Sequence, residues 1–256
     1  METARHRLAW VPRQHGTWAM LIAPVLTGGI LAGFRWPQVL LLVTWIAAYL
    51  AFMAIRGWLG PHRGRYTTPA LVWTVLAAAG VAVLVAWRPA ITWWALPLTV
   101  LFGTSLLLIR AGLERTVPND AIMIGASCLM AAMAATSRGL SRAVGPSAFL
   151  NSVALPWAWL VAAIFAGYFW GTIPYVKTMI RERGKWGWYA ASVIYHLALV
   201  VPAFLINPWL GGLSLVILLR AAAVPRLWPH AKPKWIGLGE VAVTVLLVII
   251  VCLTIS

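Results

Sequence analysis

Acidic residues are scarce in this chain of 256 residues, and charge of either sign is limited. Only five residues are Asp or Glu, and charged residues of all kinds make up 10% of the sequence. A typical soluble domain is about one quarter charged and about half apolar, whereas 62% of this chain is hydrophobic. The composition therefore excludes a soluble globular domain and indicates an integral membrane protein.

Cysteine and recognisable cofactor motifs are also scarce. The two cysteines, Cys128 and Cys252, lie far apart within apolar segments, which argues against a disulfide framework and a cysteine-based metal site. The signatures of a P-loop, a dinucleotide-binding loop, a zinc site and a serine-hydrolase elbow do not occur. We therefore expect no metal ion, and the cofactor, if there is one, is unknown from the sequence.

Apolar sequence without strand-like alternation is abundant. Nine apolar segments cover residues 17–34, 38–55, 69–87, 90–109, 120–136, 152–176, 188–206, 209–224 and 236–255. Most approach the ~20 residues that a helix needs to cross the hydrocarbon core of a bilayer, while the fifth and eighth are short enough to be partly re-entrant. No linker or soluble domain separates them, and the first segment has no clear signal-peptide cleavage site. The sequence predicts an all-α, polytopic bundle of about nine transmembrane helices, with residues 1–256 as one domain.

The basic residues predict how this bundle is oriented. The formal net charge is +15, and of the 20 Lys and Arg residues, 16 fall in the N-terminal segment and in every second loop. Cytoplasmic loops of membrane proteins are enriched in Lys and Arg. We therefore expect a cytoplasmic N-terminus, a C-terminus outside and the lipid bilayer as a partner. We expect no nucleic-acid partner, because no basic domain lies outside the spans.

Two basic clusters at the ends of spans are candidate anion sites. Lys177 and Arg181 follow the sixth span and are four residues apart, so a helix would place both on one face, with Glu182 beside them. Arg56 and Arg63 flank a turn rich in glycine after the second span, where arginines can clamp an anion. The alternative for both clusters is a solvated basic loop that only sets the orientation.

Carboxylates near the membrane are the second group of candidates. Glu240 lies about a turn and a half inside the ninth span, and a buried carboxylate requires a partner. Lys177, Arg181 or an N-terminal arginine could supply it, in a structural ion pair or in a ligand site. Asn119 or Asp120, after Pro118, is expected to cap the fifth span.

The remaining candidates come from polar residues next to apolar sequence. Arg13, Gln14 and His15 precede the first span, and an amide beside an imidazole has no obvious role in anchoring or orientation. We expect Gln14 and His15 to hydrogen-bond a ligand. Tyr195 and His196 form nearly the only polar pair at depth, and we expect a hydrogen bond to a neighbouring helix rather than metal ligation.

The stretch from Gln14 to Met20, with Tyr175, Lys177 and the residues 181–183, resembles the YwiC-like family of bacterial membrane proteins. This resemblance implies a multi-pass protein of the bacterial inner (cytoplasmic) membrane, and the family has no established activity.

A weaker, architectural resemblance is to the UbiA-type intramembrane prenyltransferases, which share nine spans and polar loops after the second and sixth spans. The stretch 180–185 is similar to the tail of their second Asp-rich motif. This resemblance implies a shared fold and cavity, with Mg²⁺ and a prenyl diphosphate as ligands. However, no carboxylate occurs between Glu2 and Glu114, and the later loop has only Glu182. A Mg²⁺ ion would lack its oxygen ligands, so we do not expect Mg²⁺-dependent prenyl transfer.

The sequence thus predicts a cytoplasm-facing cavity that binds an amphipathic or anionic ligand, such as a lipid, a quinone or a prenyl-type molecule. The predicted ligand-binding residues are Arg13, Gln14, His15, Arg56, Arg63, Lys177, Arg181, Glu182 and Glu240. Three alternatives remain open: a small-anion transporter, a metal-independent intramembrane enzyme with His15 or Glu182 as acid or base, and a structural membrane protein without a ligand.

Overall fold

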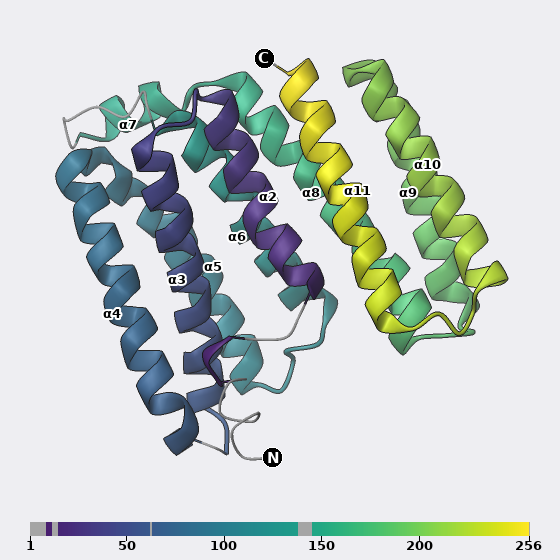
Figure 1. Ribbon diagram of the computed structural model, residues 1–256, viewed down its shortest axis with the longest axis horizontal. Helices are drawn as coiled ribbons and strands as arrows, with labels where there is room; N and C mark the ends of the chain where they lie inside the picture. The colour runs from purple at the N-terminus through teal and green to yellow at the C-terminus, as the bar shows by residue number, and fades with distance from the viewer. Residues whose placement is uncertain (1–8, 12–14, 62, 138–144, 256) are drawn as a thin grey trace.

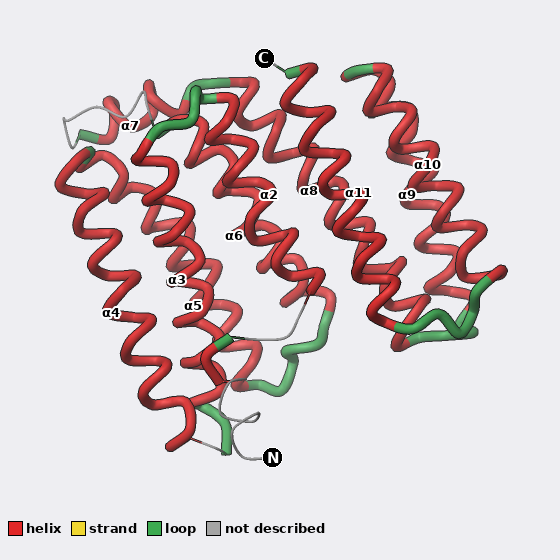
Figure 2. The backbone as a smooth tube through the Cα atoms, in the orientation of Figure 1, coloured by secondary structure: helices red, strands yellow, loops and turns green. Residues whose placement is uncertain are grey.

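The computed structural model describes residues 9–11, 15–61, 63–137 and 145–255, and for His15 it describes the backbone alone. Within these ranges the chain forms helices joined by short loops, and no strand occurs (Figure 2). The elements are α2 (His15–Leu31), α3 (Trp36–Trp58), α4 (Arg63–Trp87), η1 (Pro89–Trp94), α5 (Ala95–Arg110), α6 (Val117–Thr136), α7 (Pro146–Val153), α8 (Pro156–Val176), η2 (Lys177–Arg181), α9 (Trp186–Ile206), α10 (Pro208–Leu227) and α11 (Pro233–Thr254). The all-α prediction is confirmed.

The nine predicted apolar segments correspond to α2, α3, α4, α5 with η1, α6, α8, α9, α10 and α11, whereas α7 was not predicted as a separate helix. Among the described residues, eight helical segments are long and apolar enough to cross a membrane, and a ninth, Gly16–Leu31 in α2, is shorter. The fifth and eighth segments were expected to be short, whereas α6 and α10 each have 20 residues and are long enough to span. The count of nine spans therefore depends on α2 and stays a prediction.

Proline and glycine set many of the helix boundaries. Proline occupies the first or second position of helices α3, α6, α8, α10 and α11. A backbone N–H at these positions has no acceptor within the helix, so proline costs no hydrogen bond there. Gly112 follows α5 with a φ of 74°, and Gly184 follows η2 with a φ of 77°. These left-handed conformations suit glycine and let the chain reverse direction.

The helices form three groups that follow one another across the molecule (Figure 1). Helices α3, α4 and α5 lie at one side, the α9–α10 hairpin lies at the other, and α2, α6, α8 and α11 stand between them. The centre is held by close backbone contacts: a Cβ at Gly28 would collide with the backbone of Ala131, and the Ser127 hydroxyl donates to the Met20 carbonyl. Such close approach between small residues is typical of helix packing in membranes.

The outer faces of the bundle are apolar. In the most apolar 18-residue stretch of α4, and likewise of α9, only 11% of the residues are buried within the protein. Large side chains such as Leu71, Val201 and Leu205 are exposed. Apolar surface on this scale is unfavourable in water, whereas lipid tails cover it without cost. The chain is a multi-pass membrane protein.

The C-terminal end of α8 departs from regular α-helix. Pro174 lies inside the helix and has no N–H to donate. The following turn, η2, widens to a π-helical turn in which the Glu182 N–H donates to the Lys177 carbonyl, with an N···O distance of 2.7 Å. Single π-helical turns often occur at functional sites, and this one carries Lys177 and Arg181.

Candidate functional site

A cavity of about 610 Å³ opens where the ends of α2, α6, η2 and α11 meet, and we call it the α2–α11 cavity. Three of the predicted ligand-binding side chains line it: Lys177, Arg181 and Glu240. Its lining includes Gly16 and Thr17 of α2, Asp120 of α6 and Lys234 of α11. Residues from four separate parts of the sequence therefore meet at one place, at the end of the bundle where α2 and α11 begin (Figure 1).

Lys177 is the most buried cation of this cavity. Its ammonium Nζ lies 3.6 Å from Asp120 Oδ2 and 4.8 Å from the centre of the Trp188 ring. The Lys177 side chain is 11% exposed, and that of Asp120 is 33% exposed. A carboxylate and an aromatic face together stabilise a charge that would be costly to bury alone.

Asp120 was assigned the wrong role from the sequence. The residue at the N-cap of α6 is Thr116, and neither Asn119 nor Asp120 caps the helix. Asn119 instead accepts a hydrogen bond from the Ser105 hydroxyl at 2.6 Å and donates to the Glu114 carbonyl at 2.9 Å. The helix starts earlier than expected because Pro118 fits its first turn, so Asp120 points to Lys177. The one sequence feature that could have indicated a role for Asp120 in the site is its position at the end of an apolar span.

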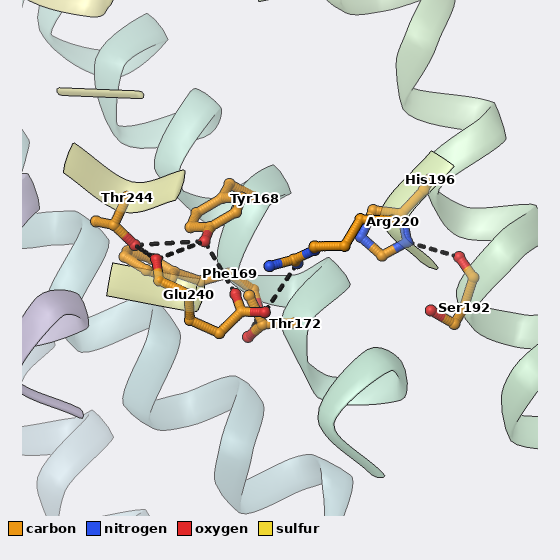
Figure 3. Close-up of polar contacts among 8 residues, drawn as sticks. All are labelled: Tyr168, Phe169, Thr172, Ser192, His196, Arg220, Glu240 and Thr244. Atoms are coloured by element: carbon orange, nitrogen blue, oxygen red, sulfur yellow. Dashed lines mark hydrogen bonds and ion pairs between the residues drawn. The ribbon is translucent and has the colours of Figure 1, made fainter. Parts of the chain in front are cut away.

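Glu240 lies deeper in the same cavity and is buried. Its Oε2 accepts a hydrogen bond from the Tyr168 hydroxyl at 2.9 Å, and its Oε1 lies 2.8 Å from Arg220 Nη2 (Figure 3). Thr244 donates to the Glu240 carbonyl at 2.7 Å, one turn further along α11. Arg220 itself packs on the Tyr175 ring at 4.3 Å.

The ion pair described for Glu240 is with Arg220 of α10. Lys177 and Arg181 were wrong as expected partners, because Lys177 pairs with Asp120 and Arg181 has no ion pair among the described residues. The N-terminal arginines lie outside the described residues. Arg220 is one of the 16 basic residues whose distribution predicts the orientation of the bundle, and no other role was expected for it. Arg220 lies well inside α10, so its pairing with Glu240 depends on how α10 and α11 pack, which sequence spacing does not reveal.

Three other predicted residues do not line this cavity. Arg56 forms an ion pair with Glu114, and the Arg63 guanidinium lies 5.1 Å from the Trp58 ring. Glu182 is 2.6 Å from Lys185 Nζ, one turn away on the surface. The structure therefore separates Arg56, Arg63 and Glu182 from Lys177, Arg181 and Glu240.

The N-terminal candidates can be placed only in part. Arg13 and Gln14 lie outside the described residues, as does the side chain of His15. Their neighbours Gly16 and Thr17, at the beginning of α2, line the α2–α11 cavity. The roles of Arg13, Gln14 and His15 stay predictions.

His196 faces a different, smaller cavity. This space of about 200 Å³ lies among α8, α9, α10 and α11, and nearly all of its lining is apolar. The Nδ1 atom of His196 is 2.7 Å from the carbonyl of Ser192 on its own helix. His196 Nδ1 therefore does not make the expected hydrogen bond to a neighbouring helix. Within the described residues, no three His, Cys, Asp or Glu side chains come close enough to hold a metal ion.

The electrostatics of the α2–α11 cavity favour an anion. Its walls carry Lys177, Arg181 and Lys234 against the carboxylates of Asp120 and Glu240, and Glu240 is already paired with Arg220. Arg181 and Lys234 have no ion-pair partner among the described residues. Helices α2, α6 and α11 all begin at this end, where unpaired N–H groups add partial positive charge.

Known proteins match both the N-terminal half and nearly the whole chain. A family model described as YwiC-like protein matches residues 11–135. The uncharacterised protein YwiC of Bacillus subtilis (strain 168) is 27% identical over 257 aligned positions, covering 97% of this chain and 99% of that protein. The chain is therefore similar to YwiC-like proteins, over residues 11–135 by the family model and over nearly its whole length by the Bacillus subtilis relative.

A second similar protein is an uncharacterised protein of Haemophilus influenzae. It is 25% identical over 243 positions, which cover 91% of this chain and 93% of the relative. Both alignments extend well beyond the part matched by the family model. No solved structure matches this chain, and the architectural resemblance to UbiA-type enzymes stays a prediction.

Proposed function

We propose that this protein binds an amphipathic anion in the α2–α11 cavity, and that the cavity faces the cytoplasm of a bacterium from the inner membrane. The observation that supports it most is the convergence of Lys177, Arg181 and Lys234 on one cavity. Ligand sites commonly have volumes of ~300–1,000 Å³, and this cavity has about 610 Å³.

The cavity has a polar mouth and an apolar depth. Its cations lie near the ends of η2 and α11, whereas Phe169 and Ile124 line it further inside. From Lys234 to Thr244, α11 rises by about 15 Å, which is roughly half of the hydrocarbon thickness. An acidic headgroup at the mouth would thus place the start of a hydrocarbon tail against the apolar walls. This arrangement favours a lipid-like or prenyl-type anion over a small hydrophilic anion.

The orientation follows from where the basic residues gather. The described helix ends at the mouth carry Arg110, Arg115, Lys185 and Arg226 as well as the cavity cations. Cytoplasmic ends of membrane proteins are rich in Lys and Arg, so we assign this end to the cytoplasm.

Thermal unfolding with defined lipids tests the proposal. The purified protein in a neutral detergent is melted with phosphatidylglycerol or with phosphatidylcholine of the same acyl chains. A ligand that binds only the folded state at 100 times its Kd stabilises it by about 2.7 kcal/mol, enough to raise Tm by several degrees. Phosphatidylglycerol is expected to raise Tm and phosphatidylcholine is not.

Two pairs of substitutions locate the effect. Lys177→Ala with Arg181→Ala is expected to abolish the rise in Tm. Lys185→Ala with Arg226→Ala removes two cations from the same end of the bundle but outside the cavity, and is expected to preserve it. Equal responses to the two lipids, or equal losses in the two double variants, would overturn the proposal. Accumulation of a small anion by proteoliposomes, without any lipid effect on Tm, would favour the transporter instead.

A further inference from the structure

A third cavity, of about 740 Å³, lies between the end of α10 and the beginning of α11, and we call it the α10–α11 cavity. Its polar walls carry Arg220, His230 and Lys232, and its aromatic walls carry Tyr175, Trp228 and Trp235. No carboxylate lines it among the described residues. It is separate from the cavity of the proposed function, which has different cations.

Arg220 is the unusual member of this wall. Its side chain is 15% exposed, and its guanidinium stacks on the Tyr175 ring, with Cζ 4.3 Å from the ring centre. Nη2 lies near Glu240, yet Nε is buried and has no hydrogen-bond acceptor among the described residues. A guanidinium has five N–H donors, and a buried donor without an acceptor is unfavourable.

We propose that the α10–α11 cavity is a second anion site, which takes a phosphate-bearing group through Arg220 and Lys232. Phosphate oxygens accept hydrogen bonds from guanidinium N–H groups, and arginine is well suited to planar, two-point recognition of phosphate. Lys232 adds a second positive charge, and His230 adds a hydrogen-bonding side chain at the same wall. The phosphate could belong to a lipid headgroup or be free in solution.

The aromatic walls fit a site at the edge of the membrane. Trp228 and Trp235 are both more than half exposed and flank the loop that joins α10 and α11. Tryptophan is enriched at the level of lipid headgroups. A phosphate that enters between these rings would meet Lys232 in the loop and Arg220 at the inner wall.

Arg220 and Glu240 also link the two anion sites. Arg220 lines the α10–α11 cavity and Glu240 lines the α2–α11 cavity, so their ion pair forms part of the wall between them. A phosphate that binds Arg220 competes with Glu240 for the same guanidinium. Removing the charge of Glu240 should therefore strengthen phosphate binding in the α10–α11 cavity.

Isothermal titration calorimetry with inorganic phosphate, in phosphate-free neutral detergent, is the first arm of the test. In the second arm, the protein is placed in phosphatidylcholine nanodiscs, and phosphatidic acid is then titrated into them. His230→Ala with Lys232→Ala leaves the Arg220–Glu240 pair in place and is expected to weaken binding by roughly tenfold or more, as for the loss of one charge-assisted hydrogen bond. Arg226→Ala, a cation of the same helix outside the cavity, is expected to change nothing.

Two further variants separate this site from the proposed function. Lys177→Ala with Arg181→Ala removes two cations from the α2–α11 cavity. In this variant, the phosphate binding that depends on Lys232 is expected to remain. Glu240→Gln is expected to increase the affinity several-fold, provided that the variant remains monodisperse and melts cooperatively.

The outcomes of the two arms differ in meaning. Binding in the first arm with this pattern of variants identifies a site for free phosphate, and binding in the second arm alone identifies a site for a lipid headgroup. No binding in either arm, or an equal loss in the Arg226 variant, would overturn the second site. A loss that follows Lys177 and Arg181 rather than Lys232 would also overturn it, while leaving the proposed function intact.

Discussion

The carboxylate of Glu240 on α11 and the guanidinium of Arg220 on α10 lie 2.8 Å apart inside the helical bundle. The same carboxylate accepts a hydrogen bond from Tyr168 of α8. This relationship joins three helices through one buried acidic group, and it connects the α9–α10 hairpin to the centre of the protein (Figures 1 and 3).

Removing only one member of this ion pair should be more harmful than removing both. Arg220→Met leaves Glu240 buried without its counter-charge, and a loss of about 3–5 kcal/mol in the free energy of unfolding is expected. Glu240→Met in the Arg220→Met background should recover most of that loss. Unfolding of all four proteins in a denaturing detergent gives the double-mutant cycle. Additive losses would contradict a direct interaction between the two side chains.

Tyr168 and Tyr175 contact the pair in different ways and should respond differently to loss of the hydroxyl. Tyr168→Phe removes the donor to Glu240 and should cost about 1.5 kcal/mol, the magnitude of a hydrogen bond to a charged group. Tyr175→Phe keeps the ring on which Arg220 stacks and should cost much less. Melting temperatures measured side by side check the difference. A larger effect at Tyr175 would mean that its hydroxyl, rather than its ring, supports Arg220.

Gly28 is predicted to be essential for the packing of α2 on α6. A Cβ at this position would overlap the carbonyl of Ala131, so Gly28→Ala should force the helices apart and lower Tm strongly. Gly125→Ala, in α6, is the matched control because its Cβ would meet no atom within 4 Å. That change should be neutral or slightly stabilising, because alanine favours helix more than glycine. Equal melting temperatures for the two variants would show that α2 and α6 do not pack this closely.

Asp120 should oppose anion binding in the α2–α11 cavity. Asp120→Asn removes the negative charge beside Lys177 and is expected to tighten binding of phosphatidylglycerol several-fold. Asp120→Asn should also lower stability, because Lys177 is buried, but by less than Arg220→Met, since Asp120 is 33% exposed and the Trp188 ring still contacts Lys177. Glu114→Gln is the control, because Glu114 pairs with Arg56 outside the cavity. Weaker binding after Asp120→Asn would show that Asp120 positions Lys177 for the ligand instead.

The sequence alone predicts the helices well because hydropathy and proline act locally. Long apolar segments must form helices in a bilayer to satisfy their backbone hydrogen bonds. Pro118 and Pro208 mark where α6 and α10 begin. The length of α10 was nevertheless underestimated, since it continues through Pro225 and Arg226 to Leu227.

The site is less predictable because its contacts join residues far apart in the sequence. Lys177 and Arg181 could be paired from their spacing on one helix, and both line the same cavity. The partners Asp120 and Arg220 depend on which helices become neighbours. Asp120 was read as a cap, and Arg220 as one more orienting charge, because local sequence offers a sufficient explanation for each of them.

Native mass spectrometry of the protein purified from its own membranes shows whether the α2–α11 cavity holds an acidic ligand. We expect an additional bound mass, of an acidic lipid-like molecule, on the wild-type protein and on the variant with Lys185→Ala and Arg226→Ala. The same mass should be absent from the variant with Lys177→Ala and Arg181→Ala. If the wild-type protein carries no such molecule, or if it remains bound equally when Lys177 and Arg181 are removed, the α2–α11 cavity is not the anion site proposed for it.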